Sequence, residues 1–348
     1  MALKYRIKQP VILSLIEHSP SREHIMEYAV ETQGLTKRFN DLLAVDGLNL
    51  QIKQGEIYGL LGPNGAGKTT TLSMLATLLK PTSGTAQVSG YDIITQPGKV
   101  RRSIGIVFQD PSSDDILTGR ENLYLHALMF GVPKQERKKR IDYVLNLVDL
   151  SDRKNDLVKK YSGGMRRRLE LARGLLHNPR ILFLDEPTLG LDPQTREHIW
   201  HYIENLVETE KVTVIITTHY MEEADRLCDR IAIIDNGHVI ALDSPSSLKS
   251  KMGGEVVKLQ TRSPKLDQIE KLEYVLSVKK GESSTLLTVK NASIHLQEIL
   301  SMVGQVESVE IRTPTLNDVF LQYTGHEIRE ESGEGGVMQR IVQLRRGH

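Results

Sequence analysis

The chain has 348 residues, more than one compact domain of ordinary size, so its length predicts one large domain and one smaller domain. A hydrophobic content of 39% with 26% charged residues excludes a largely disordered chain, and the single cysteine, Cys228, excludes a disulfide framework or a cysteine-based zinc cluster. The 45 Lys and Arg residues against 44 Asp and Glu give a net charge of +1, so we expect no nucleic-acid partner.

Residues 1–27 have no clear hydrophobic period, and we expect them to form an N-terminal extension, with Met26 as an alternative start. The apolar stretch at 11–16 is too short for a signal peptide. No apolar stretch reaches the roughly 18 to 20 residues that cross a bilayer, so we expect no membrane span.

From residue 28 to about 245, apolar runs alternate with helical patterns, which predicts an α/β domain. Its strands read as continuous apolar runs, typical of a parallel sheet buried on both faces. We expect an apolar run at 44–52, strands at 56–61, 104–109, 181–185, 212–217 and 231–235, and a helix at 69–79. Helical periodicity replaces the strand signals at about 110–177, which predicts an inserted helical subdomain.

A turn at 244–247 and the Gly253-Gly254 pair mark a boundary, after which a new pattern begins. We expect strands at 256–260, 274–278, 286–290 and 306–312 and helices at 264–272 and 293–302. This order is that of a ferredoxin-like β-α-β-β-α-β unit, so residues 255–325 are predicted to form a small α+β domain. The glycine-rich, charged residues 326–348 are expected to be a flexible tail.

Residues 62–69 read GPNGAGKT and fit the phosphate-binding loop G-x-x-x-x-G-K-[ST], between a predicted strand and a predicted helix. Such a loop turns backbone N–H groups toward phosphate oxygens. Lys68 is expected to reach the β and γ phosphates, and Thr69 to offer its hydroxyl to Mg²⁺. A glycine-rich helix entry without a ligand is the alternative. The predicted nucleotide contacts of this loop are Gly62, Asn64, Gly65, Gly67, Lys68, Thr69 and Thr70.

Two carboxylates, Asp185 and Glu186, end the apolar run at 181–184. Asp185 is predicted to hold Mg²⁺, and Glu186 to polarise the attacking water as general base. Alone, an acidic pair after a buried strand is as often a turn or a helix cap. Beside Lys68 it predicts nucleotide hydrolysis.

Together with Ser162-Gly163-Gly164 and His219, these motifs resemble the nucleotide-binding subunits of ABC transporters over residues 28–243. The resemblance implies a P-loop NTPase core of the ABC ATPase type, with ATP and Mg²⁺ as cofactors. In that family the S-G-G element opens a helix and faces the γ-phosphate of ATP held by the other subunit. Ser162 can cap such a helix, and the two glycines keep side chains away from an anion. A lone S-G-G is more often a linker, so its position 19 residues before Ile181 gives it weight.

The resemblance implies roles for four further residues. Gln109 would contact Mg²⁺ or the attacking water, and His219 would sense the γ-phosphate, so both join the catalytic set. Asp192, within the loop at 190–193, would communicate across the subunit interface, and Phe39 would stack on adenine. The alternatives are a polar strand end for Gln109, an ordinary buried or surface histidine, a helix cap for Asp192 and core packing for Phe39.

Met165 stands where most members have Gln, and Arg166–Arg168 follow it. With the stretch PTLNDVF at 314–320, this resembles the daunorubicin-resistance-type (ABC-2) exporter branch. The chain has one phosphate loop and one S-G-G element, so we expect an ATP-dependent dimer with a second ATP-binding subunit, in the simplest case a homodimer. We expect an integral membrane permease to carry the substrate, docked on the helical subdomain, with this chain at the cytoplasmic face of the membrane.

Two alternatives stay open from the residues alone. One is a soluble ABC-type ATPase of translation or DNA repair, although such proteins usually carry two ATPase units or a long coiled-coil insert. The other is a P-loop kinase, which would leave no role for 162–164 or for His219. The transported compound is left open between a drug, a lipid, a polysaccharide and an ion, and export is implied only by the resemblance.

Overall fold

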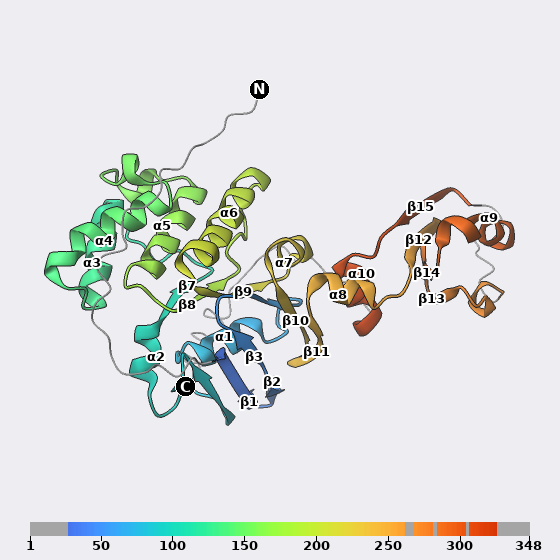
Figure 1. Ribbon diagram of the computed structural model, residues 1–348, viewed down its shortest axis with the longest axis horizontal. Helices are drawn as coiled ribbons and strands as arrows, with labels where there is room; N and C mark the ends of the chain where they lie inside the picture. Colours follow the sequence, from blue (N-terminus) through green and yellow to red (C-terminus); the bar gives the residue numbers. More distant parts are fainter. Residues whose placement is uncertain (1–26, 262–267, 281–283, 304–305, 326–348) are drawn as a thin grey trace.

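The computed structural model describes residues 27–261, 268–280, 284–303 and 306–325. The first 26 residues of the predicted extension at 1–27 and the whole predicted tail at 326–348 lie outside the described residues. Figure 1 shows a large lobe that carries β1 to β11, and a smaller lobe built from β12 to β15 with α9. The helices α8 and α10 lie where the two lobes meet.

The large lobe is organised by a six-stranded sheet in the order β11-β10-β4-β9-β8-β7. Its strands are β4 (Ile57–Leu61), β7 (Ile104–Val107), β8 (Ile181–Asp185), β9 (Thr213–Thr218), β10 (Arg230–Asp235) and β11 (His238–Asp243). All pair in parallel except β11, which forms an antiparallel hairpin with β10. The five predicted parallel strands are confirmed, with ends that differ by at most two residues. Because the strands are parallel, the loops after β4, β7, β8 and β9 all leave from one edge of the sheet.

A second sheet, which the sequence did not predict as such, is antiparallel and has the order β2-β1-β5-β6, with β3 paired to β1. Its strands are β1 (Tyr28–Phe39), β2 (Leu42–Leu48), β3 (Gln51–Lys53), β5 (Ser83–Val88) and β6 (Tyr91–Asp92). One apolar cluster joins this sheet, the central sheet and α1 (Lys68–Leu75), as Val30, Leu72 and Phe183 illustrate. The predicted helix at 69–79 was wrong in its end: α1 stops at Leu75, because Thr77 adopts a left-handed φ of 61°.

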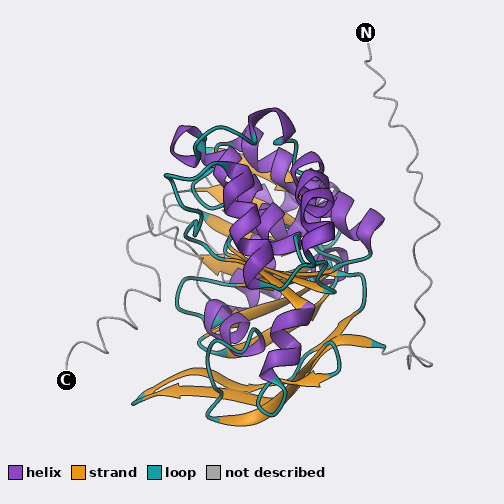
Figure 2. Cartoon of the chain, turned by 90° about the vertical axis from the view of Figure 1, so that its left-hand side faces the viewer, coloured by secondary structure: helices purple, strands orange, loops and turns teal. Residues whose placement is uncertain are grey.

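Helices cover the other face of the central sheet, as the purple ribbons above the orange strands show in Figure 2. They are α3 (Gly119–Met129), α4 (Lys134–Leu147), α5 (Gly163–Leu175), α6 (Pro193–Glu210) and α7 (Met221–Leu227). The short 3-10 turns η1 (Ser151–Arg153) and η2 (Val158–Lys160) lie between α4 and α5. The remaining helix, α2 (Pro97–Ser103), contacts β6 and β7 and buries Val100 in the first apolar cluster. A capping box between Thr118 and Glu121 starts α3. The helices and the central sheet share a second apolar cluster, so the helical insertion packs directly on the parallel core.

The small lobe is a four-stranded antiparallel sheet in the order β13-β14-β12-β15, which is the ferredoxin-like strand order. Its elements are β12 (Glu255–Gln260), β13 (Val275–Lys280), β14 (Thr285–Val289), α9 (Ala292–Val303) and β15 (Ser308–Arg312). Of the predicted helix at 264–272, residues 264–267 lie outside the described residues, and the remainder holds only a 3-10 turn, η3 (Ile269–Lys271).

Two helices tie the small lobe to the large one: α8 (Pro245–Ser250) and α10 (Leu316–Thr324). Val319 and Phe320 of α10 are fully buried in the same apolar cluster as Ala224 of α7. The PTLNDVF stretch therefore belongs to the junction between the lobes, where it packs against the helix that follows His219.

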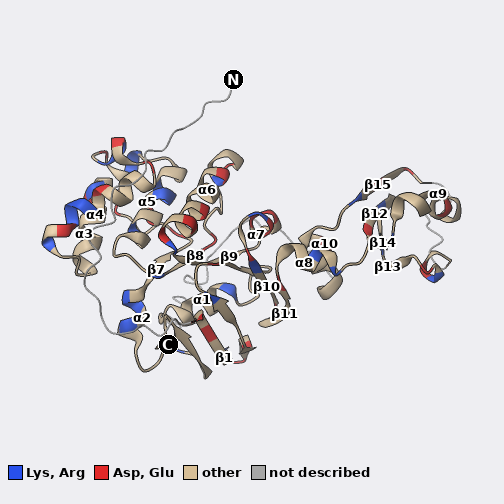
Figure 3. Cartoon of the chain, viewed as in Figure 1, with Lys and Arg blue, Asp and Glu red and all other residues tan. Residues whose placement is uncertain are grey.

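Charges of both signs are spread over the surface (Figure 3). Blue segments mark Lys and Arg on α2 and α4. Two of the basic side chains of α4 make hydrogen bonds within the fold: Arg137 donates to the Val132 carbonyl at 2.7 Å, and Arg140 donates to the Leu176 carbonyl at 3.0 Å. In the described part of the chain, every helix is too short or too polar to cross a bilayer.

Candidate functional site

The loop between β4 and α1 is shaped by glycines at positions where a side chain would clash or where φ is positive. Gly67 has a φ of 106°, and a Cβ there would lie 2.4 Å from the Ala44 carbonyl oxygen. A Cβ on Gly62 would lie 2.1 Å from the Ile234 carbonyl oxygen, and Gly65 has a φ of 86°. Since Gly67 is the N-cap of α1 and brings no side-chain cap, the first N–H groups of this helix stay available to an anion.

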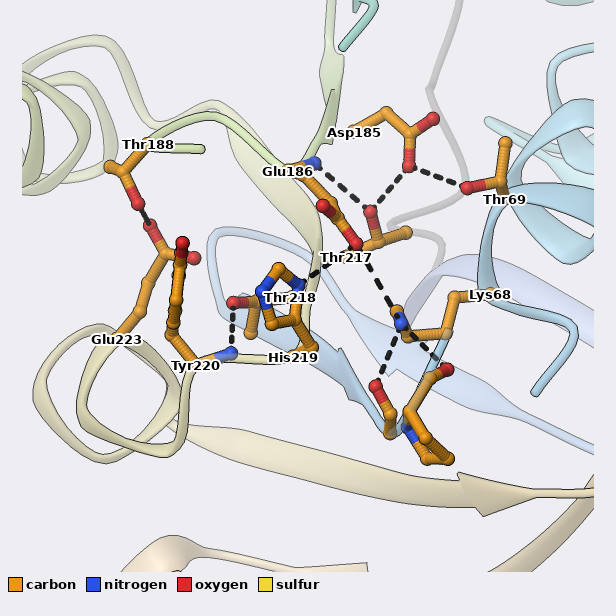
Figure 4. A network of polar contacts seen from close by, with 12 residues as sticks. Lys68, Thr69, Asp185, Glu186, Thr188, Thr217, Thr218, His219, Tyr220 and Glu223 are labelled. Carbon is orange, nitrogen blue, oxygen red and sulfur yellow. Dashed lines mark hydrogen bonds and ion pairs between the residues drawn. The ribbon is translucent and has the colours of Figure 1, made fainter. Parts of the chain in front are cut away.

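Lys68 lies across this loop and is almost fully buried, with 4% of its surface exposed. Its ammonium group donates to the carbonyls of Gly62 at 2.7 Å and Pro63 at 3.0 Å, and lies 3.7 Å from Oε1 of Glu186 (Figure 4). Burial lowers the pKa of Lys68, and the carboxylates of Glu186 and Asp185 oppose that shift. Loop carbonyls and one carboxylate thus hold the Lys68 ammonium group in a place where phosphate oxygens could exchange for them.

Asp185 ends β8 beside the phosphate loop. Its Oδ1 accepts hydrogen bonds from Thr69 of α1 at 2.9 Å and from Thr217 of β9 at 2.5 Å. Burial raises the pKa of Asp185, which the two hydroxyl donors partly offset. A carboxylate next to a threonine hydroxyl is the oxygen set that Mg²⁺ takes when substrate phosphates and waters complete its shell. These two side chains therefore fit a magnesium ion.

Glu186 is held in a strained backbone conformation, with a φ of 47°. Its N–H donates to the Thr217 carbonyl and is also 3.1 Å from the hydroxyl oxygen of that residue, while its Oε1 pairs with Nδ1 of His219 at 3.1 Å. Burial would raise the pKa of Glu186, but the hydrogen bond with His219 and the charge of Lys68 outweigh it and lower the pKa. Glu186 is therefore kept ionised, as a general base must be.

The S-G-G element lies on α5, and its surface is open. Ser162 is exposed and caps the helix, accepting a hydrogen bond from the Met165 N–H at 3.3 Å. Gly163 is also exposed, whereas a Cβ on Gly164 would lie 2.5 Å from Cγ2 of Thr195. The two glycines stay predicted to clear a path for an anion, and for Gly164 the close packing of α5 on α6 is a second reason for the absence of a side chain.

Asp192 is exposed and caps α6, through hydrogen bonds from the Thr195 N–H at 3.0 Å and hydroxyl at 2.6 Å. The helix-cap alternative for this residue is thus realised in the structure. Its neighbour Leu191 would be 3.8 Å from a Cβ on Gly163, so the loop at 190–193 and the S-G-G element form one continuous surface.

Gln109 and Phe39 stand apart from the Lys68 network. Gln109 is half-buried, two residues beyond the end of β7, at the sheet edge from which Asp185 also emerges. Phe39 ends β1 and is half-buried outside the apolar clusters, with the Lys37 ammonium 5.0 Å from its ring centre. The core-packing alternative for Phe39 is therefore wrong, and its ring is accessible.

Comparisons with known proteins agree with this geometry. Residues 45–189 match the family model described as ABC transporter, and residues 244–324 match that of the C-terminal domain of DrrA1-3-like ATP-binding proteins. The daunorubicin/doxorubicin resistance ATP-binding protein DrrA of Streptomyces peucetius is 40% identical over 323 residues, covering 90% of this chain and 98% of that protein. This chain belongs to the ABC transporter family.

Other relatives are also named as ATP-binding proteins of resistance or export systems. The linearmycin resistance ATP-binding protein LnrL of Bacillus subtilis is 38% identical over 86% of this chain and 100% of its own length. The Nod factor export ATP-binding protein I of Ralstonia nicotianae is 37% identical over 86% of this chain and 95% of its own length. The expected branch, that of the daunorubicin-resistance ATP-binding proteins, is thereby confirmed.

Solved ABC structures share the fold of the large lobe. Part of a cbiONQ transporter complex, cbiO1 of Clostridium perfringens, aligns with a TM-score of 0.61 at 31% identity, over 65% of this chain and 92% of that one. A dimeric ATP-binding cassette in a post-hydrolysis state with ADP and phosphate aligns with a TM-score of 0.56 at 31% identity, over 62% of this chain and 98% of that one. The P-loop NTPase fold and the ATPase activity of an ABC transporter subunit are confirmed, and the kinase alternative is excluded.

One charged residue next to the site of this ABC subunit was not predicted. Glu223 of α7, four residues after His219, is fully buried and accepts a hydrogen bond from the Thr188 hydroxyl at 2.6 Å (Figure 4). It also accepts one from the Trp200 indole N–H at 3.1 Å. Burial raises the pKa of Glu223. It joins α7, α6 and the segment after Glu186. The only signal in the sequence is an acidic residue on the apolar face of a short helix.

Proposed function

We propose that this ABC subunit binds ATP with Mg²⁺ and that its hydrolysis drives conformational change in a separate membrane permease. The observation that carries the proposal is one continuous network, in which Lys68 and Thr69 of the phosphate loop meet Asp185, Glu186 and His219. Each member comes from the same edge of the parallel sheet, where α/β proteins of this type bind their ligands.

The catalytic roles follow from these contacts. Lys68 would exchange its two loop carbonyls for oxygens of the β and γ phosphates. Thr69 and Asp185 would hold a magnesium ion, which would supply charge neutralisation for phosphoryl transfer. Glu186, kept ionised by its neighbours, accepts a proton from the attacking water. His219 then reports on the γ-phosphate through the carboxylate that it shares with Lys68.

The remaining predicted contacts surround this centre. The backbone of Gly62, Gly65 and Gly67 lines the phosphates, and Asn64 and Thr70 complete the loop and the first turn of α1. Gln109 meets the metal or the water from β7, and Phe39 stacks on the adenine. These last two roles have support only from position: a shared sheet edge for Gln109 and an accessible ring for Phe39.

A second copy of the chain completes each site. Ser162, Gly163 and Asp192 lie on a single exposed surface whose hydrogen bonds cap their own helices, and this surface fits the γ-phosphate of ATP bound to a partner chain. A homodimer is the simplest arrangement, since each chain brings one phosphate loop and one S-G-G element.

The permease is proposed to dock on the helical subdomain at 110–177. Four large apolar side chains of α3 are exposed there, between 43% and 80%: Tyr124, Leu125, Leu128 and Met129. The relatives' names favour export of a drug or a lipid-like compound, and the complex would then sit at the cytoplasmic face of a membrane. The chain divides into an ATPase domain at 28–245 and an accessory domain at 255–325.

Purified chain tests the proposal directly through Lys68→Ala. The variant is expected to lose magnesium-ATP turnover and to bind ATP at least about tenfold more weakly, because the buried ammonium is the main charge facing the phosphates. Turnover would be measured by phosphate release, and binding with a fluorescent ATP analogue. Lys138→Ala, at an exposed position of α4 away from the loop, offers a charge-matched comparison for loss of a lysine. Unchanged turnover in Lys68→Ala would refute the assigned site.

A further inference from the structure

Three consecutive arginines follow Met165 on α5, and only one of them is buried. Arg167 is 5% exposed, and its guanidinium donates to three main-chain carbonyls. Nε donates to Pro187 at 2.6 Å, Nη2 to Asp185 at 3.1 Å and Nη1 to Phe108. The two other arginines also have partners in the fold, because Arg166 pairs with Asp115 and Arg168 donates to the Val148 carbonyl.

The three carbonyls belong to chain segments whose relative positions determine the geometry of the site. Phe108 directly precedes Gln109, Asp185 is the proposed magnesium ligand, and Pro187 directly follows Glu186. All three lie where the chain leaves the carboxyl ends of β7 and β8. A planar guanidinium with five fixed donors can hold three carbonyls at once, which an ammonium group cannot do with the same geometry.

The other end of this connection is the exposed S-G-G element. Arg167 lies five residues after Ser162, within the first two turns of the same helix. A displacement of the start of α5 is therefore passed by a short, buried and hydrogen-bonded path to the segment that carries Asp185 and Glu186. Because the guanidinium is desolvated and meets only carbonyls at hydrogen-bond distance, a shift of either end changes several bonds together.

We infer that Arg167 is a positioning residue: it couples the S-G-G surface, which meets the partner's ATP, to the carboxylates that act on the chain's own ATP. The inference rests on the proposed function, since it requires that a partner's nucleotide contacts Ser162. It assigns to this arginine a role in turnover that does not depend on touching nucleotide.

The neighbouring Arg168 provides a matched control on the same helix. It also donates to two main-chain carbonyls, those of Val148 and Asp149, both at 3.1 Å, but these lie between α4 and η1, away from the sheet edge. Arg167→Lys and Arg168→Lys thus make the same chemical change at adjacent positions, and only the carbonyls that lose a donor differ.

The experiment compares these two variants as full-length protein, with turnover, ATP binding and thermal midpoint measured for each. Arg167→Lys is expected to lower kcat about 10- to 100-fold with KM and ATP affinity within about twofold, as when the supporting shell of a metal site is lost. Arg168→Lys is expected to stay within about twofold of the unsubstituted chain in all three. Ser162→Ala should lower kcat in the unsubstituted chain, but should cause no further loss when added to Arg167→Lys, because the connection is already broken.

Three results would overturn the inference. Equal kcat values for the two lysine variants would leave Arg167 without a role in turnover. A loss of ATP binding, or of the folded state, in parallel with kcat would make it a structural residue only. An undiminished effect of Ser162→Ala in Arg167→Lys would show that the two residues act independently. Failure of the unsubstituted chain to hydrolyse ATP would instead contradict the proposed function.

Discussion

The two surfaces that this chain offers to ATP are prepared in different ways. Around Lys68 the polar groups are buried and paired with one another: the ammonium with two carbonyls and Glu186, and Asp185 with two threonine hydroxyls. Around Ser162 the surface is exposed, and its polar groups cap the helices on which they lie. The first surface is preorganised for chemistry, and the second for contact with a partner.

This difference explains why the two surfaces need different residue types. A buried centre must balance charge, so it combines one lysine, two carboxylates and a histidine. The carboxylates oppose the fall in the pKa of Lys68 that burial causes, and His219 and Lys68 lower the pKa of Glu186 against the effect of burial. An exposed helix start needs only N–H groups and little side-chain bulk. Substitutions at the buried centre should therefore affect chemistry, while those at the exposed one should affect packing or assembly.

The largest expected effect of this kind comes from Glu186→Gln. The amide keeps the size of the side chain but cannot accept the proton of water, so turnover should fall about 10²- to 10⁴-fold. ATP binding should change little, because the lysine and the magnesium ligands remain. Phosphate release and ATP affinity, measured on the same preparation, distinguish a loss of catalysis from a loss of ATP binding. A matching loss of both would mean that Glu186 holds the fold of the loop instead of activating water.

The next largest effect is on stability, and it should differ between the two glycines of the S-G-G element. Gly164→Ala should lower the free energy of unfolding by about 1 to 3 kcal/mol, because its methyl group meets Cγ2 of Thr195. Gly163→Ala, with Leu191 at 3.8 Å as its nearest neighbour, should change it far less. Chemical denaturation would measure both.

A second substitution isolates the cause of that loss. Thr195→Ser removes Cγ2 and keeps the hydroxyl that binds Asp192, so it should restore much of the stability of Gly164→Ala. Equal destabilisation by Ala at 163 and at 164 would contradict the packing explanation.

The smallest effect concerns how the helical subdomain is attached to the core. His126 of α3 lies near His177, whose Nε2 is 2.8 Å from the carbonyl oxygen of Ile104 in β7. Burial, together with the charges of Arg173 and His177, lowers the pKa of His126 to about 4. Between pH 6.5 and 4 the unfolded chain therefore takes up a proton that folded His126 refuses, so stability falls as the pH falls through this window.

Replacement of His126 by Phe should remove that part of the pH dependence. Because the ring is partly exposed, the difference in unfolding free energy between pH 7 and pH 4.5 should shrink by about 1 to 2 kcal/mol. Denaturant midpoints at several pH values would measure it. Parallel pH profiles for the two proteins would show that His126 titrates normally in the folded chain.

Sequence alone predicted the parallel core and the buried centre because both have strong local signals. Five strands read as uninterrupted apolar runs, and the motifs at 62–69 and 185–186 follow two of them directly. The fold then had only to bring the ends of neighbouring parallel strands together, which their topology guarantees.

The antiparallel strands of the large lobe were missed because their patterns are weak. β5 reads SGTAQV, with few apolar residues, and the alternation in β1 is irregular over its 12 residues. β11 was missed although Asn236 and Gly237, both with positive φ, form the two-residue turn typical of a hairpin. That signal was present in the sequence and could have been used.

The roles of Arg167 and Gly164 could not have been predicted from local sequence. Arg167 is one of three consecutive arginines, and its burial depends on carbonyls that come from 20 and 59 residues away. Gly164 is constrained by Thr195 on another helix. Both effects depend on tertiary contacts, which periodicity and motif spacing do not encode.

The central claim is that the buried centre of one chain meets the exposed S-G-G surface of another around ATP. Size-exclusion chromatography of Glu186→Gln with magnesium-ATP, calibrated by light scattering, tests it most directly. The account predicts a dimer with ATP, a monomer with ADP, and a monomer in both when Lys68→Ala is added. A Glu186→Gln chain that binds ATP but stays monomeric would contradict the account.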